Sequence, residues 1–335
     1  MAGNGVRKLR QVQFGGETTA GIAVTATTIW RGSGTGQDER VVEFPVEDVG
    51  LISGSDRTVE TKRLAGIQLD EVNATFEQML HPLECGVKLV NTGATDGLGS
   101  DHIYTYPVAT NALPTVKTKT IKAGDNQAAE VMEYGFLTSL TLRGNGGEGL
   151  KVTQVWNGRQ WQPSTFDAPT LPAVEDIPFS KGKLYIDNVA SSAGTTLKSA
   201  TFLGLNMSLK TGLIPKYTAD GNVYFSFVQC TDPEALIAVT FEHETSAVAE
   251  KAAFRAQTPR LIQITWQGSN LTTAGSSYST KLFQITAAGK WEKFDKLGEQ
   301  NGNDIVVGHL RARWDAVASQ FLTFLLVEEG LATVP

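Results

Sequence analysis

The stretch Arg311–Asp315 (RARWD), followed by Phe321–Val327 (FLTFLLV), indicates the fold of this chain better than any other part. Around the first stretch, the apolar residues Leu310, Ala312 and Trp314 alternate with charged ones. A period of two places one face of a strand on a core and the other on water or a neighbour. The second stretch is a short apolar run, which is typical of a buried strand. Two late β-strands are therefore predicted.

The same alternation recurs along the chain of 335 residues, as in Leu140–Arg143 and Leu203–Lys210. Many of the 34 glycines separate short alternating segments, the pattern of an all-β sandwich or barrel. Residues 137–143 and 150–156 form one expected strand pair. The fold class predicted from these patterns is mainly β.

Two segments have helical spacing instead. From Asp70 to Leu83, apolar residues recur at helical intervals, with Asp70 as N-cap and Pro82 near the end. Ser246–Ala256 is rich in alanine and is followed by Pro259, which stops a helix. Each half of the chain is thus predicted to carry one flanking helix.

The segment from Pro163 to Pro178 is the best candidate for a linker, because proline favours extended backbone and cannot join a central strand ladder. We place a domain boundary there. The prediction is two tandem β-sandwich or barrel domains, residues 1–172 and 173–335.

Composition limits the function. The net charge is −6 and both halves are mildly acidic, so no basic face of the size needed to bind duplex DNA is expected. Val6–Arg10 is too polar for a signal peptide, and Phe321–Val327 is far shorter than a bilayer span. Cys85 and Cys230 are expected to be buried free thiols.

Motifs of enzyme chemistry are missing. Residues 144–149 (GNGGEG) match the glycine spacing of a dinucleotide-binding loop, but a strand-like segment follows where a helix is needed. A hairpin turn explains these glycines better. No phosphate loop, nucleophile elbow or paired-histidine metal motif occurs. We therefore expect no enzyme activity, no catalytic or metal-binding residues and no cofactor.

Trp156 and Trp161 bracket a predicted tight turn. They form either a cross-strand aromatic pair that fixes the hairpin register, or a platform on which a sugar stacks.

Residues 31–40 contain three glycines and mixed charges, which predicts a mobile loop. This loop is either a flexible hairpin tip or a segment that becomes ordered against a partner subunit.

Four stretches together resemble the long-form tail tube proteins of siphophages, the bacteriophages with non-contractile tails. Residues 14–24 resemble the family's opening turn and first strand, and residues 69–87 its helix. Residues 134–142 with 149–152 resemble its long hairpin. Residues 304–315 and the closing apolar strand resemble its last two strands, with Trp314 in the place of an aromatic residue before Asp315.

The resemblance implies a structural virion protein whose rings stack into a hollow tube through which DNA passes at ejection without specific binding. Its fold would be β-sandwiches with a flanking helix. Rings would be hexamers or, for two fused tube domains, trimers with pseudo-sixfold symmetry. Whether residues 173–335 form a second tube domain or an outward decoration stays open. Its partners would be copies of itself, the tape-measure protein, the tail terminator and the distal tail proteins, with no membrane. The protein would be made in the bacterial cytoplasm and located in the virion tail.

Two sets of site residues follow from this resemblance. The candidate contacts to the adjacent ring are Arg31, Gly32, Gly34, Gly36, Asp38, Glu39 and Arg40. The candidate lumen residues on the two strands predicted at 137–143 and 150–156 are Thr138, Thr141, Arg143, Lys151 and Thr153, and Glu148 is expected near one rim. The alternative function is a carbohydrate- or receptor-binding β-module built around Trp156 and Trp161.

Overall fold

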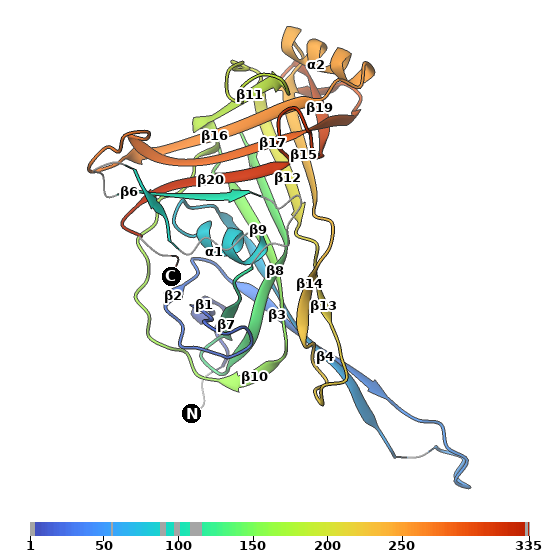
Figure 1. Ribbon diagram of the computed structural model, residues 1–335. Coiled ribbons are helices and arrows are strands. Elements are labelled where there is room, and N and C mark those ends of the chain that lie inside the picture. The colour runs from blue at the N-terminus through green and yellow to red at the C-terminus, as the bar shows by residue number, and fades with distance from the viewer. Residues whose placement is uncertain are drawn as a thin grey trace.

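A computed structural model of the protein describes residues 4–54, 56–87, 92–96, 101–107, 116–331 and 334. These residues form antiparallel β-strands with two short α-helices, so the mainly-β prediction is confirmed (Figure 1).

The strands form a long sheet that runs the length of the molecule. In order across this long sheet they are β3 (Gly34–Glu43), β4 (Val59–Asn73), β9 (Lys151–Gly158), β8 (Ala129–Asn145), β12 (Phe202–Lys210), β15 (Glu234–Glu242) and β19 (Asn303–Ala312). The short strand β18 (Gly298–Gln300) pairs with the beginning of β19. Alternate residues along β9, β15 and β19 are buried, as the period of two requires when one face of a sheet covers a core.

A second layer, the cross sheet, lies over one end of the long sheet (Figure 1). Its strands in order are β11 (Gly182–Asn188), β16 (Arg260–Asn270), β17 (Thr280–Phe294), β20 (Leu322–Glu329), β6 (Asp101–Pro107) and β5 (Ala94–Thr95). The end of β17 leaves β20 and pairs with β19, so one strand joins the two sheets. Gly289 allows this crossing, because a Cβ there would stand 2.3 Å from the Arg311 carbonyl oxygen.

A small sheet forms the opposite end of the molecule. It contains β2 (Thr28–Ile29), β1 (Gln11–Gly16), β7 (Lys119–Gly124), the first part of β8, and β10 (Trp161–Ser164). The 3-10 turn η1 (Arg7–Leu9) precedes it. Strands β13 (Leu213–Lys216) and β14 (Phe227–Cys230) form a separate hairpin beside the long sheet.

The first helix differs from its prediction. Residues 70–73 still belong to β4, and α1 spans only Leu80–Gly86. The ladder between β4 and β9 continues to Asn73, so strand pairing overrides the helical spacing. Pro82 does not end the helix but lies in its first turn, where its missing N–H has no intrahelical partner to lose.

Helix α1 is buried along its whole length. Its last residue, Gly86, lies so close to β8 that a Cβ would stand 2.5 Å from the Leu137 side chain. The second helix, α2 (Thr245–Arg255), agrees with its prediction. Its buried Glu250 bonds to Arg260 (2.9 Å) and to the Trp291 indole N–H (3.0 Å). This contact fixes α2 to the cross sheet.

The predicted proline-rich linker is an extended strap. Residues 165–175 form neither helix nor strand and run along the side of the molecule from β10 to the 3-10 turn η2 (Phe179–Lys181) (Figure 1). Both of its ends are held: Asp167 binds Lys122 (2.8 Å), and Glu175 accepts hydrogen bonds from Ser269 (2.6 and 2.7 Å).

Strands pair across the boundary predicted at residue 172. The first half's β8 pairs with β12, and its β6 pairs with β20 near the end of the sequence. One hydrophobic cluster also contains buried residues of both halves, such as Leu83 and Phe324. The halves therefore share one sheet system and one core, and their division into two tandem domains stays a prediction.

Candidate assembly surface

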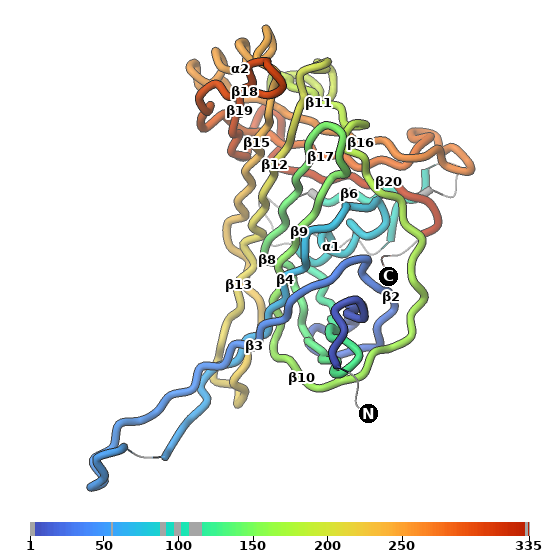
Figure 2. Tube along the Cα trace, turned by 180° about the vertical axis from the view of Figure 1, so that it is seen from behind, coloured from blue at the N-terminus to red at the C-terminus, as the bar shows by residue number. Residues whose placement is uncertain are grey.

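A β-hairpin projects from the body of the molecule (Figures 1 and 2). It consists of β3, the first part of β4 and the residues between them, and we call it the arm. Gly34 pairs with Leu69 at its base and Glu43 with Val59 near its tip. The other edge of β3 pairs with no described strand. An exposed strand edge of this length is a template for pairing with another chain.

The prediction of a mobile loop at residues 31–40 is wrong, because most of these residues belong to the arm. Gly34–Glu43 is a strand, and the turn of the hairpin lies further on, between Glu43 and Val59. The glycines serve close packing at the base instead of mobility. A Cβ on Gly34 would stand 2.8 Å from the Leu69 side chain, and one on Gly36 would stand 3.2 Å from the Trp161 ring.

The residues predicted in this loop are therefore spread along the arm. Arg31 lies before the strand and donates two hydrogen bonds to the Pro172 carbonyl oxygen (2.6 and 3.0 Å), which ties the strap to the arm's base. Gly32 contacts Trp30, since a Cβ there would stand 2.6 Å from the indole nitrogen. Asp38, Glu39 and Arg40 lie further out and are exposed.

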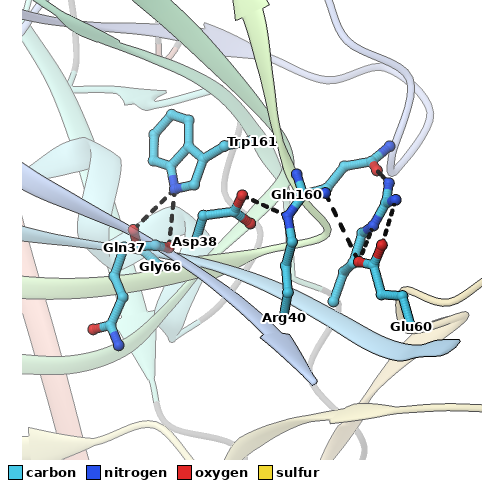
Figure 3. Close-up of polar contacts among 8 residues, drawn as sticks. Gln37, Asp38, Arg40, Glu60, Gly66, Gln160 and Trp161 are labelled. Carbon is cyan, nitrogen blue, oxygen red and sulfur yellow. Dashed lines mark hydrogen bonds and ion pairs between the residues drawn. The ribbon is translucent and has the colours of Figure 1, made fainter. Parts of the chain in front are cut away.

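Polar contacts hold the arm to the body (Figure 3). The Trp161 indole N–H donates to the carbonyl oxygens of Gln37 (3.1 Å) and Gly66 (3.2 Å), one on each strand of the arm. Glu60 forms an ion pair with Arg63, whose guanidinium also donates to the Gln160 side chain (3.1 Å). The hydrogen bond from Arg63 lowers the pKa of Glu60 below its ordinary value.

The β13–β14 hairpin braces the arm from the side. The Tyr217 hydroxyl donates to the Arg63 carbonyl oxygen (3.0 Å), and the Arg63 N–H donates to the carbonyl of Val223 (2.8 Å). The Lys62 ammonium lies 4.8 Å from the centre of the Tyr217 ring, within the range of a cation–π contact. The direction of the arm is thus fixed by two separate parts of the body, residues 160–161 and the β13–β14 hairpin.

The end of the arm is apolar and acidic. We call residues 43–54 and 56–58 the arm tip. Val46 and Ile52 are fully exposed, and Phe44 is 72% exposed. Contiguous exposed apolar side chains of this kind mark interaction sites. These residues were not predicted as site residues, although their apolar character after Glu43 is visible in the sequence.

The second surface is the outer face of the long sheet, where the predicted lumen residues lie. Thr141 is directly opposite Thr153, and Arg143 is opposite Lys151, on neighbouring strands. The β8–β9 turn between them is the predicted hairpin turn, with Gly147 at a φ of 88°. Because β9 is a strand and not a helix, this turn lacks the form of a dinucleotide-binding loop.

Two of the predicted lumen residues lie apart from these rows. Glu148 is exposed in the turn, beyond the end of the strands. Thr138 lies at a bulge between Leu137 and Ser139, and its hydroxyl donates to the Val155 carbonyl oxygen (3.0 Å).

The structure adds strands to this face that were not assigned to it from sequence. Ser208 is opposite Thr141, Asn206 is opposite Arg143, and Lys210 is opposite Ser139, so the polar rows continue from β8 onto β12. The alternation within Leu203–Lys210 predicts a strand with one polar face. It does not predict that this strand pairs with β8.

Three cations of this outer face are paired with carboxylates, whereas Lys151 forms no ion pair with a described residue. Arg143 pairs with Glu71 (3.0 Å), and Lys210 pairs with Glu234 (3.0 Å). Arg311 pairs with Glu234 and with Glu292. Hydrogen bonds from Lys210 and then Arg311 lower the pKa of Glu234, which keeps this carboxyl ionised. The face therefore presents mixed, largely compensated charge.

The aromatic pair proposed for sugar stacking is not exposed. Trp156 is fully buried in the core, and Trp161 is 5% exposed beneath the arm. Both rings belong to the same hydrophobic cluster. They therefore offer no platform to a sugar. Both cysteines are free, as predicted, but Cys230 is half-buried and only Cys85 lies in the core.

Within the described ranges, no group of three or more His, Cys, Asp or Glu side chains is placed to hold a metal ion. No helix among these residues is long and apolar enough to cross a bilayer. The chain matches no protein-family model and no curated protein.

Proposed function

We propose that this chain is a structural virion protein that polymerises as stacked rings into the hollow tail tube of a siphophage. The arm carries the proposal. It combines an unpaired strand edge on β3 with fully exposed apolar residues at its tip. In a soluble protein such a feature favours association, because a partner strand satisfies the free N–H and C=O groups and removes apolar surface from water.

A copy of the same chain is the simplest partner. When the arm of one copy contacts a different part of its neighbour, the contact is heterologous, and heterologous contacts close into rings or continue as helical filaments. The rings would be hexamers or pseudo-sixfold trimers. The tape-measure, terminator and distal tail proteins would complete the tail.

The outer face of the long sheet is the proposed lumen. Its mixed charge, with Arg143 and Lys210 each paired to a carboxylate, gives DNA no array of free cations. Counterions then stay on the phosphates, and the duplex slides past without being retained. This supports passage of DNA without specific binding.

The alternative, a carbohydrate- or receptor-binding module, depended on Trp156 and Trp161 as an exposed pair. Their burial removes that support.

Assembly of the purified protein tests the proposal. Concentrated native protein should form rings or tubes in negative-stain electron microscopy. A variant in which residues 44–57 are replaced by a short turn should stay monomeric, with an unchanged circular dichroism spectrum of the body. The proposal fails if the native chain sediments as a monomer at every concentration, even together with the tail-tip and tape-measure proteins of the same phage.

A further inference from the structure

The arm tip and the N-terminal segment carry opposite charge. The arm tip contains Glu43, Glu47, Asp48 and Asp56 against Arg57, a net charge of −3. Arg57 pairs with Glu47 (3.0 Å), which leaves three exposed carboxylates, those of Glu43, Asp48 and Asp56. None of these three forms an ion pair with a residue that the structure describes.

The basic N-terminal segment, Val6–Arg10, has the complementary character. Arg7, Lys8 and Arg10 are exposed, and none of them pairs with a described carboxylate. Next to these cations, Val6 and Leu9 expose about half of their surface (44% and 55%). In a chain of net charge −6, three unpaired cations beside two exposed apolar side chains form a surface suited to an acidic, apolar partner.

This segment is held in a fixed place. The Val6 N–H donates to the Asn126 side chain (2.8 Å) in the β7–β8 turn, and the Leu9 N–H donates to the Val6 carbonyl (2.8 Å). Strand β1 continues directly from it into the small sheet. The cations are therefore presented on an ordered turn, so little conformational entropy is lost when a partner binds.

The two surfaces lie at the same end of the molecule. In both views the arm tip and the N-terminal end are opposite α2 (Figures 1 and 2). A rotation about an axis parallel to the length of the molecule keeps each feature at its level along that axis. Within a ring, the arm of one copy is thus brought toward the level of its neighbour's N-terminal end.

We propose that the arm tip of one copy docks on the basic N-terminal segment of a second copy. This inference rests on the proposed function and names the receptor for the arm. Apolar Phe44, Val46 and Ile52 would cover Val6 and Leu9, and the carboxylates around them would meet Arg7, Lys8 and Arg10.

A second surface that could receive the arm is a cavity of about 420 Å³ beside β14, lined by Tyr134, Phe136, Leu213 and Cys230 among others. No lysine or arginine lines it. An arm tip docked there would bring three carboxylates to an apolar rim without partners, which is unfavourable. The charge of the tip therefore favours the N-terminal segment.

Charge reversal tests the docking. Arg7→Glu/Lys8→Glu/Arg10→Glu should lower the assembled fraction in sedimentation velocity about tenfold or more, as should Glu43→Lys/Asp48→Lys/Asp56→Lys. The chain carrying all six changes should assemble again. If each triple variant assembles like the native chain, or the combined chain fails while its melting temperature is native, the inference is wrong.

Disulfide trapping gives an independent readout. In a Cys230→Ser background, Leu9→Cys with Ile52→Cys should form intermolecular disulfides under mild oxidation. The control is Leu297→Cys with Ile52→Cys. Leu297 is 49% exposed near α2, and this pair should form no intermolecular disulfide. In a separate chain that keeps Cys230 and carries only Ile52→Cys, an intermolecular disulfide between these two positions would instead place the arm in the cavity and overturn the inference.

The outcomes separate the two proposals. Native protein that never assembles rejects the tube function and this docking with it. Native protein that assembles, with charge-reversed variants that assemble equally well, rejects only the docking.

Discussion

The indole ring of Trp161 packs directly over Gly36, where a Cβ would stand 3.2 Å from the ring. The same indole donates to both strands of the arm. Gly36→Val should push the ring aside, break these hydrogen bonds and lower the free energy of unfolding by about 1–3 kcal/mol. Chemical denaturation measures this loss, and the variant should also assemble less well because the arm is no longer fixed.

The matched control is Gly66→Ala on the facing strand. A Cβ there would make only ordinary contacts, 3.5 Å from the Asn157 side chain. Equal destabilisation by both changes would show that β-strand glycines in general, and not the packing of Trp161, account for the effect.

A second prediction concerns Glu250 in α2. Its carboxylate is 2% exposed and binds Arg260, the Trp291 indole and, at 3.8 Å, Lys198. Glu250→Ala leaves buried donors without an acceptor and should destabilise the protein by about 3–5 kcal/mol. Thermal unfolding would measure the loss.

Glu250→Gln serves as the control for this site. It keeps an oxygen for the Trp291 N–H and should cost less than Glu250→Ala. If both variants unfold at the native temperature, the contact does not anchor α2.

A third prediction concerns pH. Glu328 is completely buried; one carboxyl oxygen accepts from the Leu331 N–H (3.2 Å), and the other has no hydrogen-bond partner among the residues that the structure describes. Burial, and then the nearby charge of Glu77, raises the pKa of Glu328 to about 8. The folded protein therefore binds this proton more tightly than the unfolded chain does. Its stabilising contribution is complete below the ordinary glutamate pKa and is lost as the pH rises toward about 8.

Glu328→Gln should remove this dependence. Relative to native protein, the variant should gain about 1.4 kcal/mol of stability per pH unit between roughly pH 5 and pH 8. Urea denaturation at pH 5, 6.5 and 8 would measure the difference, with Glu148→Gln in the exposed β8–β9 turn as the control for loss of one charge. A difference that stays constant with pH contradicts the burial argument.

A fourth prediction tests the outer face as a lumen. Thr141→Lys with Thr153→Lys adds two unpaired cations to one cross-strand pair. Each added phosphate contact steepens the salt dependence of DNA binding by about 0.9 in a double-logarithmic plot. Assembled variant tubes should therefore retain duplex DNA at low salt where native tubes do not, as measured by co-sedimentation.

Val317→Lys with Val248→Lys adds the same charge at exposed positions on other elements and is the control. If this pair retains as much DNA as the threonine variants, net charge and not the long-sheet face governs the interaction.

The sequence was most informative where alternation was regular. The strands around Leu140 and Leu205 and the turn at Gly147 agree with their predictions, because a period of two fixes which side chains are buried. The strand around Leu310 agrees only as far as Ala312, where β19 ends, and Trp314 lies outside it and is 52% exposed, contrary to its prediction. Helix α2 was equally clear from its alanines and the proline that follows.

Three features depended on distant contacts and were therefore missed. The ladder from β9 keeps residues 70–73 in a strand despite their helical spacing. Trp161 makes an ordered strand of a glycine-rich segment that resembles a loop. Strand β17 pairs first with β20 and then with β19, and so joins the two sheets. No local sequence pattern predicts this change of partner.

The pairing of β6 with β20 has a consequence for synthesis. Tyr104 in β6 donates a hydrogen bond to the Leu331 carbonyl oxygen, 227 positions later. A ribosome must therefore make almost the whole described chain before β6 acquires this neighbour, and contacts so distant in sequence form slowly. Folding in this region therefore waits until β20 has been made, long after β6 itself has left the ribosome.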